Sequence, residues 1–426
     1  MSTKTNMFLV TVILFSSSLV TFAANAGTGE GTAEDPLLVS TVIVPSIAHG
    51  KINIVGNTQL AAFFAGNTSD GTSGKPYVIQ GFEINAGGTG SAIYIEDTDK
   101  HLIIQSCNVQ GSGNTVGSAG IRLNNCTNVI VRWNTLANNA YHGIHVEAGS
   151  HDVMIEGNAI TSNARIGISL YDVRDVMVSQ NTITGASNLT SIGINVETAT
   201  NVTVQLNNMS SPMAYGIWFT GGVYQGRITG NRITNCSYTG ISITESSMVV
   251  VDNNIVTRCS YHGLEIFNDC CDSNITHNLV TYCGFAGIRF YNGNDNITGN
   301  KIWYNAFVHN RDGESLTRWM VPTENDWDVG GIGNYWGDYR ERYPAATQSG
   351  NVWNTPYAIN ETTYAADHDY FPLVSIDLIT GQGPGPTGTP LIEAALWIIL
   401  IAFLAAAALV VFKAHQLGVL LPRSYK

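Results

Sequence analysis

Charged residues are scarce in this 426-residue chain, and basic residues are the scarcer kind. Charged side chains make up 12% of the sequence, and 20 Lys and Arg against 32 Asp and Glu give a formal net charge of −12. An acidic chain without a basic stripe lacks the electrostatic footprint of a nucleic-acid-binding protein, so we predict no nucleic-acid partner. The apolar fraction of 44% is too high for an intrinsically disordered chain.

Helix formers are also scarce through the middle of the chain. Val, Ile, Thr, Asn and Gly dominate there, as is typical of strands and tight turns. One phrase, glycine followed by alternating apolar residues, returns every 23 to 26 residues, at Gly120, Gly143, Gly167, Gly193, Gly216, Gly240, Gly263 and Gly287. A fixed period in this range indicates a solenoid, in which each unit buries its apolar face against its neighbours.

A second phrase, Val-x-Val-x-x-Asn, lies between the glycines. Its asparagines form one predicted column: Asn134, Asn158, Asn181, Asn207, Asn231, Asn253, Asn278 and Asn300. Asparagine tolerates left-handed backbone and hydrogen-bonds locally, so the column predicts a turn with stacked amides.

Two solenoids fit this period. The asparagine phrase also matches a leucine-rich repeat, but each period holds a second strand-like phrase where that repeat would place a helix. We therefore predict an all-β fold, a parallel β-helix with rungs of about 23–26 residues. In each rung the apolar residues after glycine, such as Ile144 and Val146, should point inward, while Gly143, His145 and Glu147 point outward.

The two ends of the chain predict a tethered surface protein. A charged start, an apolar run over 7–22 and Ala24-Asn25-Ala26 resemble a secretory signal. The apolar segment 391–412, followed by basic residues, is long enough to span a membrane with a cytoplasmic tail. The predicted divisions are a signal peptide (1–26), an N-terminal linker and strand cap (27–75), β-helix repeats (76–305), an aromatic-rich C-terminal cap (306–375), a Gly/Pro linker (376–390), a transmembrane helix (391–412) and a tail (413–426).

Nine Asn-x-Ser/Thr sequons agree with a location outside the cell and predict a glycoprotein. They begin at Asn67, Asn125, Asn188, Asn201, Asn208, Asn235, Asn274, Asn296 and Asn360.

Three of the seven cysteines recur at the rung period. Cys236, Cys259 and Cys283 should stack in adjacent rungs, close enough for a disulfide or a soft-metal site. By their spacing Ala140 and Ala164 are predicted to occupy the same place in earlier rungs, which favours a small inward-facing position where cysteine acts as a compact hydrophobe. The adjacent pair Cys270-Cys271 offers no metal-ligand spacing, and we predict no metal or cofactor.

The outward columns are the best candidate for a site. Glu147 and Glu197 lie two rungs apart, roughly 9–10 Å by strand spacing, which is near the separation used by inverting glycosidases. Carboxylates, amides and aromatic rings together suit sugars, whose rings stack on aromatic faces. The predicted ligand-binding residues are Arg122, His145, Tyr171, Asn195 and Trp218; an ordinary solvated sheet face is the alternative.

The ends of the repeat region resemble a known family. Residues 333–339 (GNYWGDY) and 355–359 (TPYAI) are similar to the closing segment of right-handed parallel β-helix proteins of the carbohydrate-binding and sugar hydrolase (CASH) type, and more narrowly of NosD-like archaeal and bacterial surface proteins. Asp70-Gly71-Thr72 with 76–79 resembles their opening segment. Relatives commonly carry an acidic loop before Thr-Pro-Tyr, whereas this chain has 349–354 (SGNVWN) there.

Three functions follow from these features. The first is a membrane-anchored extracellular protein that binds a polysaccharide or another cell-surface partner without catalysis. The second is a polysaccharide hydrolase or lyase that acts on the outward sheet face. The third, implied only by the NosD-like resemblance, is an accessory protein for metalloenzyme assembly.

Overall fold

The computed structural model describes residues 46–185, 191–210, 213–291, 297–311, 325–359 and 367–380, and the backbone of four further strands. The chain divides into two compact units, one of which is mainly Pro45–Thr380 and holds the repeats. In the other unit, β1 (Phe8–Ile13), β2 (Ser18–Ala24) and β3 (Ser40–Ile43) form an antiparallel sheet. β1 and β2 fall within the predicted signal segment, and cleavage of that segment stays a prediction.

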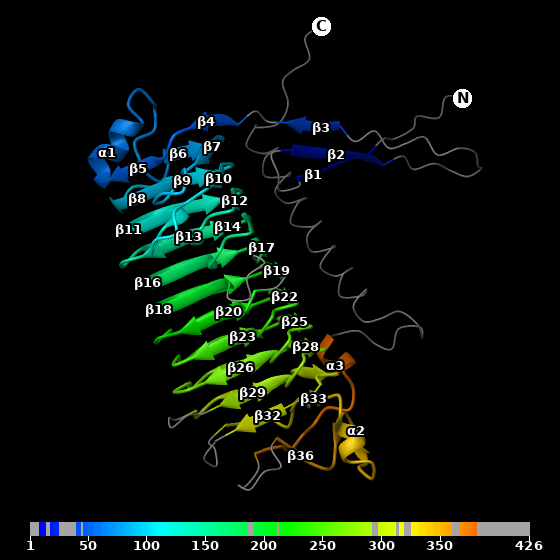
Figure 1. The fold of residues 1–426 in the computed structure, drawn as a ribbon. Coiled ribbons are helices and arrows are strands. Elements are labelled where there is room, and N and C mark those ends of the chain that lie inside the picture. Colours follow the sequence, from blue (N-terminus) through cyan, green and yellow to red (C-terminus); the bar gives the residue numbers. More distant parts are fainter. Residues whose placement is uncertain are drawn as a thin grey trace, which may run out of the picture. The chain divides into compact units, whose positions relative to one another are not determined.

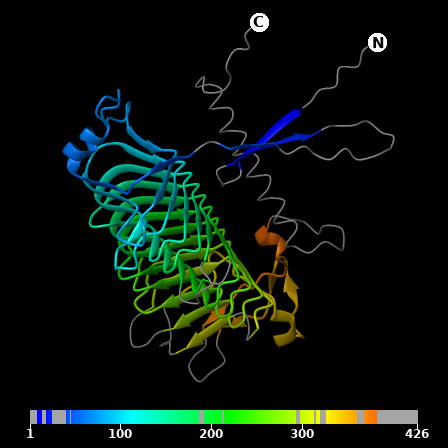
Figure 2. The ribbon, with the colours of Figure 1, turned by 45° about the horizontal axis from the view of Figure 1, so that its top comes forward.

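The repeat unit is a parallel β-helix, as the glycine period predicts (Figure 1). Successive rungs pair in parallel, so that Ile144 lies between Ile121 and Ile168. Three sheets run along the coil, and its successive turns are visible in Figure 2. Three long strands turn a corner and contribute to both sheet 1 and sheet 2: β11 (Ala119–Arg132), β16 (Ile166–Ser179) and β18 (Ile192–Gln205).

The other strands each belong to one sheet. Sheet 1 also contains β5 (Ile52–Val55), β8 (Ile93–Thr98), β13 (His142–Glu147), β20 (Tyr215–Thr220), β23 (Thr239–Thr244), β26 (Leu264–Phe267), β29 (Ile288–Tyr291) and β32 (Ser315–Arg318). Sheet 2 also contains β6 (Tyr77–Gln80), β9 (Leu102–Gln105), β14 (His151–Glu156), β21 (Arg227–Thr229), β24 (Val250–Asp252), β27 (Asn274–Thr276) and β30 (Lys301–Trp303). Sheet 3 contains β4 (Ile47–His49), β7 (Phe82–Asn85), β10 (Asn108–Gln110), β12 (Thr135–Ala137), β15 (Ala159–Thr161), β17 (Thr182–Thr184), β19 (Asn208–Ser210), β22 (Arg232–Thr234), β25 (Ile255–Thr257), β28 (Leu279–Thr281), β31 (Ala306–Val308) and β33 (Tyr335–Trp336).

The core is a set of aliphatic columns inside the coil. Ile144 and Val146 have no exposed surface, and neither have their counterparts Ile168 and Leu170 in the next rung. Each such side chain contributes about 1.5–3 kcal/mol by leaving water. This period-2 burial confirms the inward direction predicted for the residues after glycine.

The N-terminal end of the coil carries a helix that the sequence analysis did not anticipate. α1 (Gly56–Phe63) follows β5 and buries Leu60 completely. The segment was expected to contribute strands alone. Its eight residues show no strong helical pattern, and the helix is stabilised by packing of Leu60 rather than by an N-cap side chain.

Buried asparagines form a hydrogen-bonded ladder that joins every rung from β12 to the C-terminal end. The amide nitrogen of each donates to the amide oxygen of the next, as from Asn158 Nδ2 to Asn181 Oδ1 at 2.9 Å. The ladder consists of Asn134, Asn158, Asn181, Asn207, Asn231, Asn254, Asn278, Asn305 and Asn334. The predicted column of stacked amides is therefore present.

Two members of that predicted column are wrong. Asn254, not Asn253, continues the ladder, and Asn305 takes the place predicted for Asn300. Asn253 is the residue before the ladder position, where the backbone is left-handed with φ 55°. The left-handed residue of each turn is thus the neighbour of the ladder asparagine, and Asn300 belongs to a separate turn in which it bonds Asn325.

The cysteine column is also shifted by one residue from its predicted counterparts. Cys236 lies five residues after Asn231, so its equivalents are Asn139 and Asn163, not Ala140 and Ala164. Cys236 Sγ would lie 3.4 Å from a Cβ on Gly216, and Asn139 Nδ2 is likewise a near neighbour of a Cβ on Gly120. The two side chains therefore occupy equivalent places in their rungs. Cys236, Cys259 and Cys283 are buried, and the described residues contain no disulfide. Core packing is the arrangement that the structure shows.

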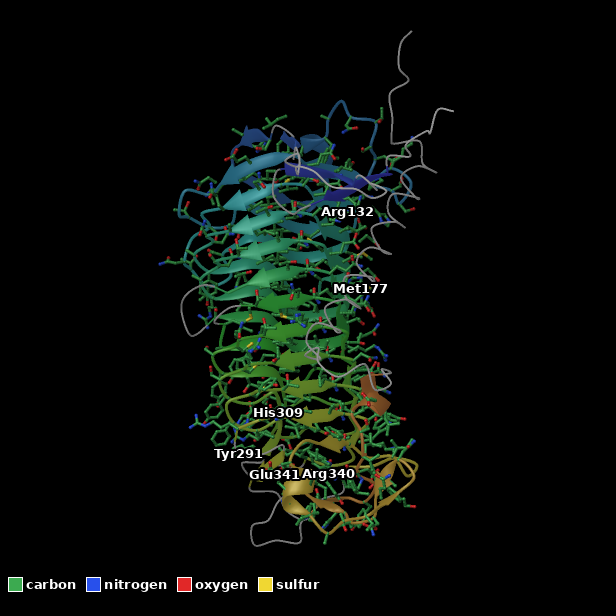
Figure 3. The ribbon with its side chains drawn as sticks, turned by 90° about the vertical axis from the view of Figure 1, so that its right-hand side faces the viewer. Arg132, Met177, Tyr291, His309, Arg340 and Glu341 are labelled. Carbon is green, nitrogen blue, oxygen red and sulfur yellow. The ribbon has the colours of Figure 1, made fainter. Side chains whose placement is uncertain are left out.

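The C-terminal end of the coil is covered by stacked aromatic rings. Trp336 stacks on Phe307 of the last full rung at 4.9 Å and on Tyr357 at 4.3 Å. Around them lie α2 (Tyr339–Arg342), α3 (Asp377–Thr380) and two short hairpins, β34 (Gln348–Ser349) with β35 (Val352–Trp353) and β36 (Tyr357–Ala358) with β37 (His368–Asp369). Arg340 and Glu341 mark α2 in Figure 3.

The predicted transmembrane segment 391–412 lies outside the described residues. Within the part of the chain that the structure describes, no helix is long and apolar enough to cross a membrane.

Candidate functional site

Two positions of each rung form columns on the outward side of sheet 1, and their side chains stack in two of the rungs. One comes just before the rung glycine and the other two positions after it. Tyr215 stacks on Trp218 with ring centroids 4.8 Å apart, and the rings of His142 and His145 are 4.9 Å apart. These pairs form the floor of what we call the sheet-1 groove: Ala119/Arg122, His142/His145, Ile166/Ser169, Ile192/Asn195, Tyr215/Trp218, Thr239/Ser242, His262/Glu265 and Ala286/Arg289.

The turns that lead into the floor strands form a wall of this groove. Tyr261 stacks on Tyr238 at 4.6 Å and on Phe285 at 5.0 Å, while the Arg165 guanidinium lies over the Tyr141 ring at 4.9 Å. Between the wall and the floor is a cavity of about 500 Å³, lined by Ala140, Ala164, Arg165, Ile192, Ala214, Tyr215 and Trp218.

His145 lies on the predicted outward side but is largely covered. It is 7% exposed, because His142 packs against its ring and Glu147 accepts a 3.0 Å contact from its Nε2. The predicted outward direction is wrong for Gly143, because a Cβ there would meet the buried side chains of Ile160 and Asn163. Period 2 predicts the side of the sheet to which His145 points, whereas the exposure of its ring depends on neighbouring residues.

Glu147 is held as an anion near the N-terminal end of the groove. Arg122 Nε donates to Glu147 Oε1 at 2.6 Å, Asn124 Nδ2 donates to the same oxygen at 3.2 Å, and His145 Nε2 contacts Oε2. Burial alone would raise the pKa of Glu147, but the contacts with His145 and Arg122 outweigh it and lower the pKa to about 2. Because both oxygens of Glu147 already have partners, this carboxylate is suited to positioning other side chains or to binding a ligand.

A second ionic cluster lies farther along the floor, at Glu265. Arg289 Nη1 donates to Glu265 Oε1 at 2.7 Å and lies 3.4 Å from His262 Nε2, while Ser242 Oγ is 3.4 Å from Oε2. Burial raises the pKa of Glu265 despite Arg289. Burial, and then the Arg289 charge, lower the pKa of His262 to about 3, so this imidazole is neutral.

Several polar atoms buried in the groove have no hydrogen-bond partner in the described part of the protein. They are His142 Nδ1, His145 Nδ1, Asn195 Oδ1, Thr239 Oγ1 and Arg289 Nε. Ser112 Oγ, in the turn after β10, is the other such side-chain atom among the described residues. Each buried polar group left unpaired costs about 1–3 kcal/mol, so their concentration on one surface calls for a polar occupant.

The remaining predicted residues lie along the edge of the same surface. Tyr171 is 47% exposed and lines up with Glu197 in the next rung. Glu147 occupies the corresponding position one rung before Tyr171, so Tyr171 stands between the two carboxylates, as the predicted two-rung separation requires. Trp218 Nε1 donates to Thr244 Oγ1 at 3.3 Å, which fixes its indole plane.

The site residues predicted from the sequence run from Arg122 to Trp218, so Glu265, Arg289 and His262 were left out. Opposite charges in one outward column of adjacent rungs were a signal that could have found Glu265 and Arg289. The burial of His262, which has no exposed surface, had no such signal.

No cluster of three or more His, Cys, Asp or Glu side chains that could hold a metal ion is present among the described residues. Cys236, Cys259 and Cys283 therefore form no such cluster with His, Asp or Glu side chains of the described residues.

Solved β-helix structures of low sequence identity are similar to this chain. A tailspike protein of E. coli bacteriophage HK620 has 11% identity and a TM-score of 0.49, covering 66% of this chain and 61% of its own. The periplasmic alginate epimerase AlgG has 15% identity and a TM-score of 0.44, covering 65% of this chain and 84% of its own. The enzymatically active domain of bacteriophage CBA120 tailspike protein 2 has 14% identity and a TM-score of 0.42, covering 64% of this chain. The aligned part amounts to 44% of that tailspike domain.

No curated protein sequence matches the chain. A family model described as "Right handed beta helix region" matches residues 67–225 and 186–317, more than half of the chain. The matched residues span the rungs from β6 to β31, whose parallel stacking is on view in Figure 1. The chain therefore belongs to the right-handed β-helix family.

Proposed function

We propose that this protein binds an extended glycan in the sheet-1 groove. The observation that supports it best is the set of buried, unpartnered polar atoms along the floor, bordered by stacked aromatic rings. Sugar hydroxyls both donate and accept hydrogen bonds, so one ligand chemistry can pair with imidazole, amide, hydroxyl and guanidinium groups alike. A sugar ring face can stack on the face of Trp218 that Tyr215 leaves free.

The repeat itself suits a polymer. Equivalent floor pairs recur at each strand spacing of about 4.8 Å, and the hydrogen-bonded coil holds them rigidly. A rigid site avoids much of the ordering cost that binding a long ligand otherwise carries.

Truncation of the aromatic floor tests this function. We expect Trp218→Ala to weaken binding on a glycan array and in calorimetry by about tenfold, through the loss of ring stacking. Tyr171→Ala should weaken it less, because Tyr171 lies at the edge. The matched control is Trp133→Ala, which removes a 43% exposed tryptophan that lies over Arg132, outside the groove. Equal binding by all three variants and the native protein would exclude the groove as the site.

Glu265 favours a second function, hydrolysis or lysis of a polysaccharide. It is a carboxyl that burial keeps more readily protonated than usual, within the same groove, and a general acid needs such a group. If Glu265→Gln abolishes release of reducing or unsaturated sugar ends while glycan binding persists, the protein is an enzyme. Glu147→Gln and Glu197→Gln test the pair predicted from the sequence in the same assay. Absence of turnover by the native protein on glycans that it binds supports a binder without catalysis.

The location of the protein is also a proposal. The sequence features of 1–26 and 391–412 support a solenoid outside the cell, anchored in the membrane by one C-terminal helix. Protease added to intact cells should then remove the solenoid, and a protected solenoid with a digested tail would contradict this topology. The NosD-like and CASH subtypes, as well as modification of the sequons, belong to the same set of proposals.

A further inference from the structure

The cavity of the sheet-1 groove has a composition unlike the rest of the floor. Its seven lining residues include three alanines, two aromatic residues and one cation, Arg165, but no carboxylate. The volume of about 500 Å³ lies within the range of small-ligand pockets, roughly 300–1,000 Å³. The alanines leave space in front of the stacked rings of Tyr215 and Trp218, so the cavity can accept one sugar unit of a longer chain.

Arg165 differs from the other arginines of the groove in its partners. Arg122 is paired with Glu147, and Arg289 with Glu265. No ion pair is recorded for Arg165 in the described part of the chain, although the protein as a whole is acidic. Its charge is therefore available to a ligand.

The contacts of Arg165 hold its guanidinium in place. Nη1 donates to the Tyr141 hydroxyl at 2.7 Å, and the guanidinium carbon lies 4.9 Å from the centre of the Tyr141 ring. A guanidinium carries five N–H donors, so most of them are left for a ligand. Its planar fork matches a carboxylate by two parallel hydrogen bonds, which a lysine cannot reproduce.

The other side of the cavity offers complementary groups. Trp218 presents an indole face fixed by its bond to Thr244, and Tyr215 stacks beside it. Asn195, in the neighbouring strand of the floor, carries a buried amide oxygen with no partner among the described residues. A sugar ring stacked on the indole can direct a charged substituent toward Arg165 across the cavity.

We propose that this cavity is a subsite for an acidic sugar, whose ring stacks on the free face of Trp218 and whose carboxylate pairs with Arg165. The inference rests on the proposed glycan-binding function and names its ligand class, a polysaccharide that contains uronic acid residues. Net negative charge over the rest of the protein opposes indiscriminate polyanion binding, so recognition depends on this one cation.

The test compares uronic acid oligosaccharides with their carboxyl-reduced counterparts, which keep the ring and hydroxyls but lose the charge. Galacturonate, glucuronate and mannuronate oligomers and one sulfated neutral oligosaccharide complete the set, and affinities are measured by calorimetry on the full chain. We expect at least one uronate oligomer to bind about tenfold or more tightly than its reduced form. Arg165→Gln should abolish that difference, and Arg165→Lys should restore part of it.

Arg174→Gln is the matched control. Arg174 belongs to β16, is exposed and pairs with Asp175 outside the groove, so its loss should leave the uronate preference unchanged. Equal binding of acidic and reduced oligomers, or an unchanged preference in Arg165→Gln, overturns the acidic-sugar subsite but leaves the proposed function intact. Preference for the sulfated oligosaccharide over every uronate overturns the carboxylate assignment. Failure to bind any glycan, acidic or neutral, refutes the proposed function itself.

Discussion

Asp369 is a carboxylate with no exposed surface, at the C-terminal end of the asparagine ladder. Its Oδ2 accepts hydrogen bonds from Asn334 N at 2.7 Å and Trp336 Nε1 at 2.9 Å, and its Oδ1 accepts one from Phe371 N at 3.0 Å. Burial raises the pKa of Asp369 to about 7, although these hydrogen bonds oppose the shift. The folded protein therefore holds this proton more tightly than the unfolded chain, in which the pKa of Asp is about 3.9.

This carboxyl predicts a stability that falls with rising pH. Its contribution is fully present below about pH 4 and is lost as pH rises through about 7, a change of up to about 4 kcal/mol. Thermal unfolding between pH 4 and 8 should show this loss in the native protein and a flatter profile in Asp369→Asn. Asp152→Asn, which neutralises an exposed carboxylate in β14, should keep the native slope. A native profile as flat as that of Asp369→Asn would rule out a titrating Asp369.

Asn181 illustrates what a ladder residue contributes. Its Nδ2 donates to Ile155 O at 2.9 Å and to Asn207 Oδ1 at 3.0 Å, and its Oδ1 accepts from Asn158 N at 2.9 Å. Asn181→Ala leaves several buried groups unpaired at about 1–3 kcal/mol each. We expect denaturant unfolding to show a loss of at least about 3 kcal/mol.

Asn253→Gly is the control for that loss. Asn253 is exposed and left-handed, a backbone conformation that glycine adopts at no steric cost, so the variant should unfold within about 0.5 kcal/mol of the native protein. A large loss in Asn253→Gly would contradict the register that places Asn254 in the ladder, and a small loss in Asn181→Ala would contradict a stabilising role of the ladder itself.

At the scale of the rung, the recurring glycine permits close contact between neighbouring turns. A Cβ on Gly167 would lie 2.6 Å from the Gly193 carbonyl oxygen and 2.8 Å from Ile183 Cγ2. Gly167→Ala should therefore destabilise the protein by about 1–3 kcal/mol through overpacking, measurable by chemical denaturation. Gly74→Ala, where a Cβ meets nothing within 4 Å, is the control and should change stability little.

The glycine and asparagine phrases were enough to predict the stacked parallel strands and their inward columns. One error of register arose where two asparagines are adjacent. Asn253 and Asn254 follow each other, and the phrase alone does not tell which of the two side chains points inward. The cysteine counterparts inherited the same one-residue shift. Local spacing fixes a period, whereas the hydrogen bond from Asn231 to Asn254 fixes the register.

The groove could be predicted only in part. Period 2 placed Arg122, His145, Asn195 and Trp218 on one side of sheet 1, and the structure places them there. It could not show that the residue before each glycine shares that side, because this depends on the turn geometry that brings Tyr215 against Trp218. Burial of the floor and the unpartnered atoms are tertiary properties with no local sequence signal.

At the scale of the whole repeat unit, stacked aromatic rings lie over the C-terminal end of the solenoid. Trp336 covers Phe307, and Trp327 lies against Phe290 at 5.1 Å. A chain that ends at Arg311 would expose these phenylalanines and unpaired strand edges, which are templates for association. We expect this truncation to form oligomers or aggregates in size-exclusion chromatography and to melt earlier.

A chain that ends at Thr380 retains the cap and serves as the comparison. This chain should elute at the volume of the intact repeat unit, without the oligomers or aggregates expected of the shorter one. A monomeric truncation at Arg311 with an unchanged melting temperature would show that the aromatic segment is an appended module and not a cap.

The asparagine ladder has a polarity along the coil. Each ladder amide accepts from the preceding rung through its oxygen and donates one N–H to the following rung, while Nδ2 also bonds a backbone carbonyl, as at Asn181. The side-chain dipoles from Asn134 through Asn334 therefore share one direction along the coil. The positive end of this array meets the Asp369 carboxylate, much as the N-terminus of a helix meets an anion. The ionisation of one carboxyl is thereby coupled to the last rungs of the coil, because the effect of an aligned dipole array falls off within its terminal turn.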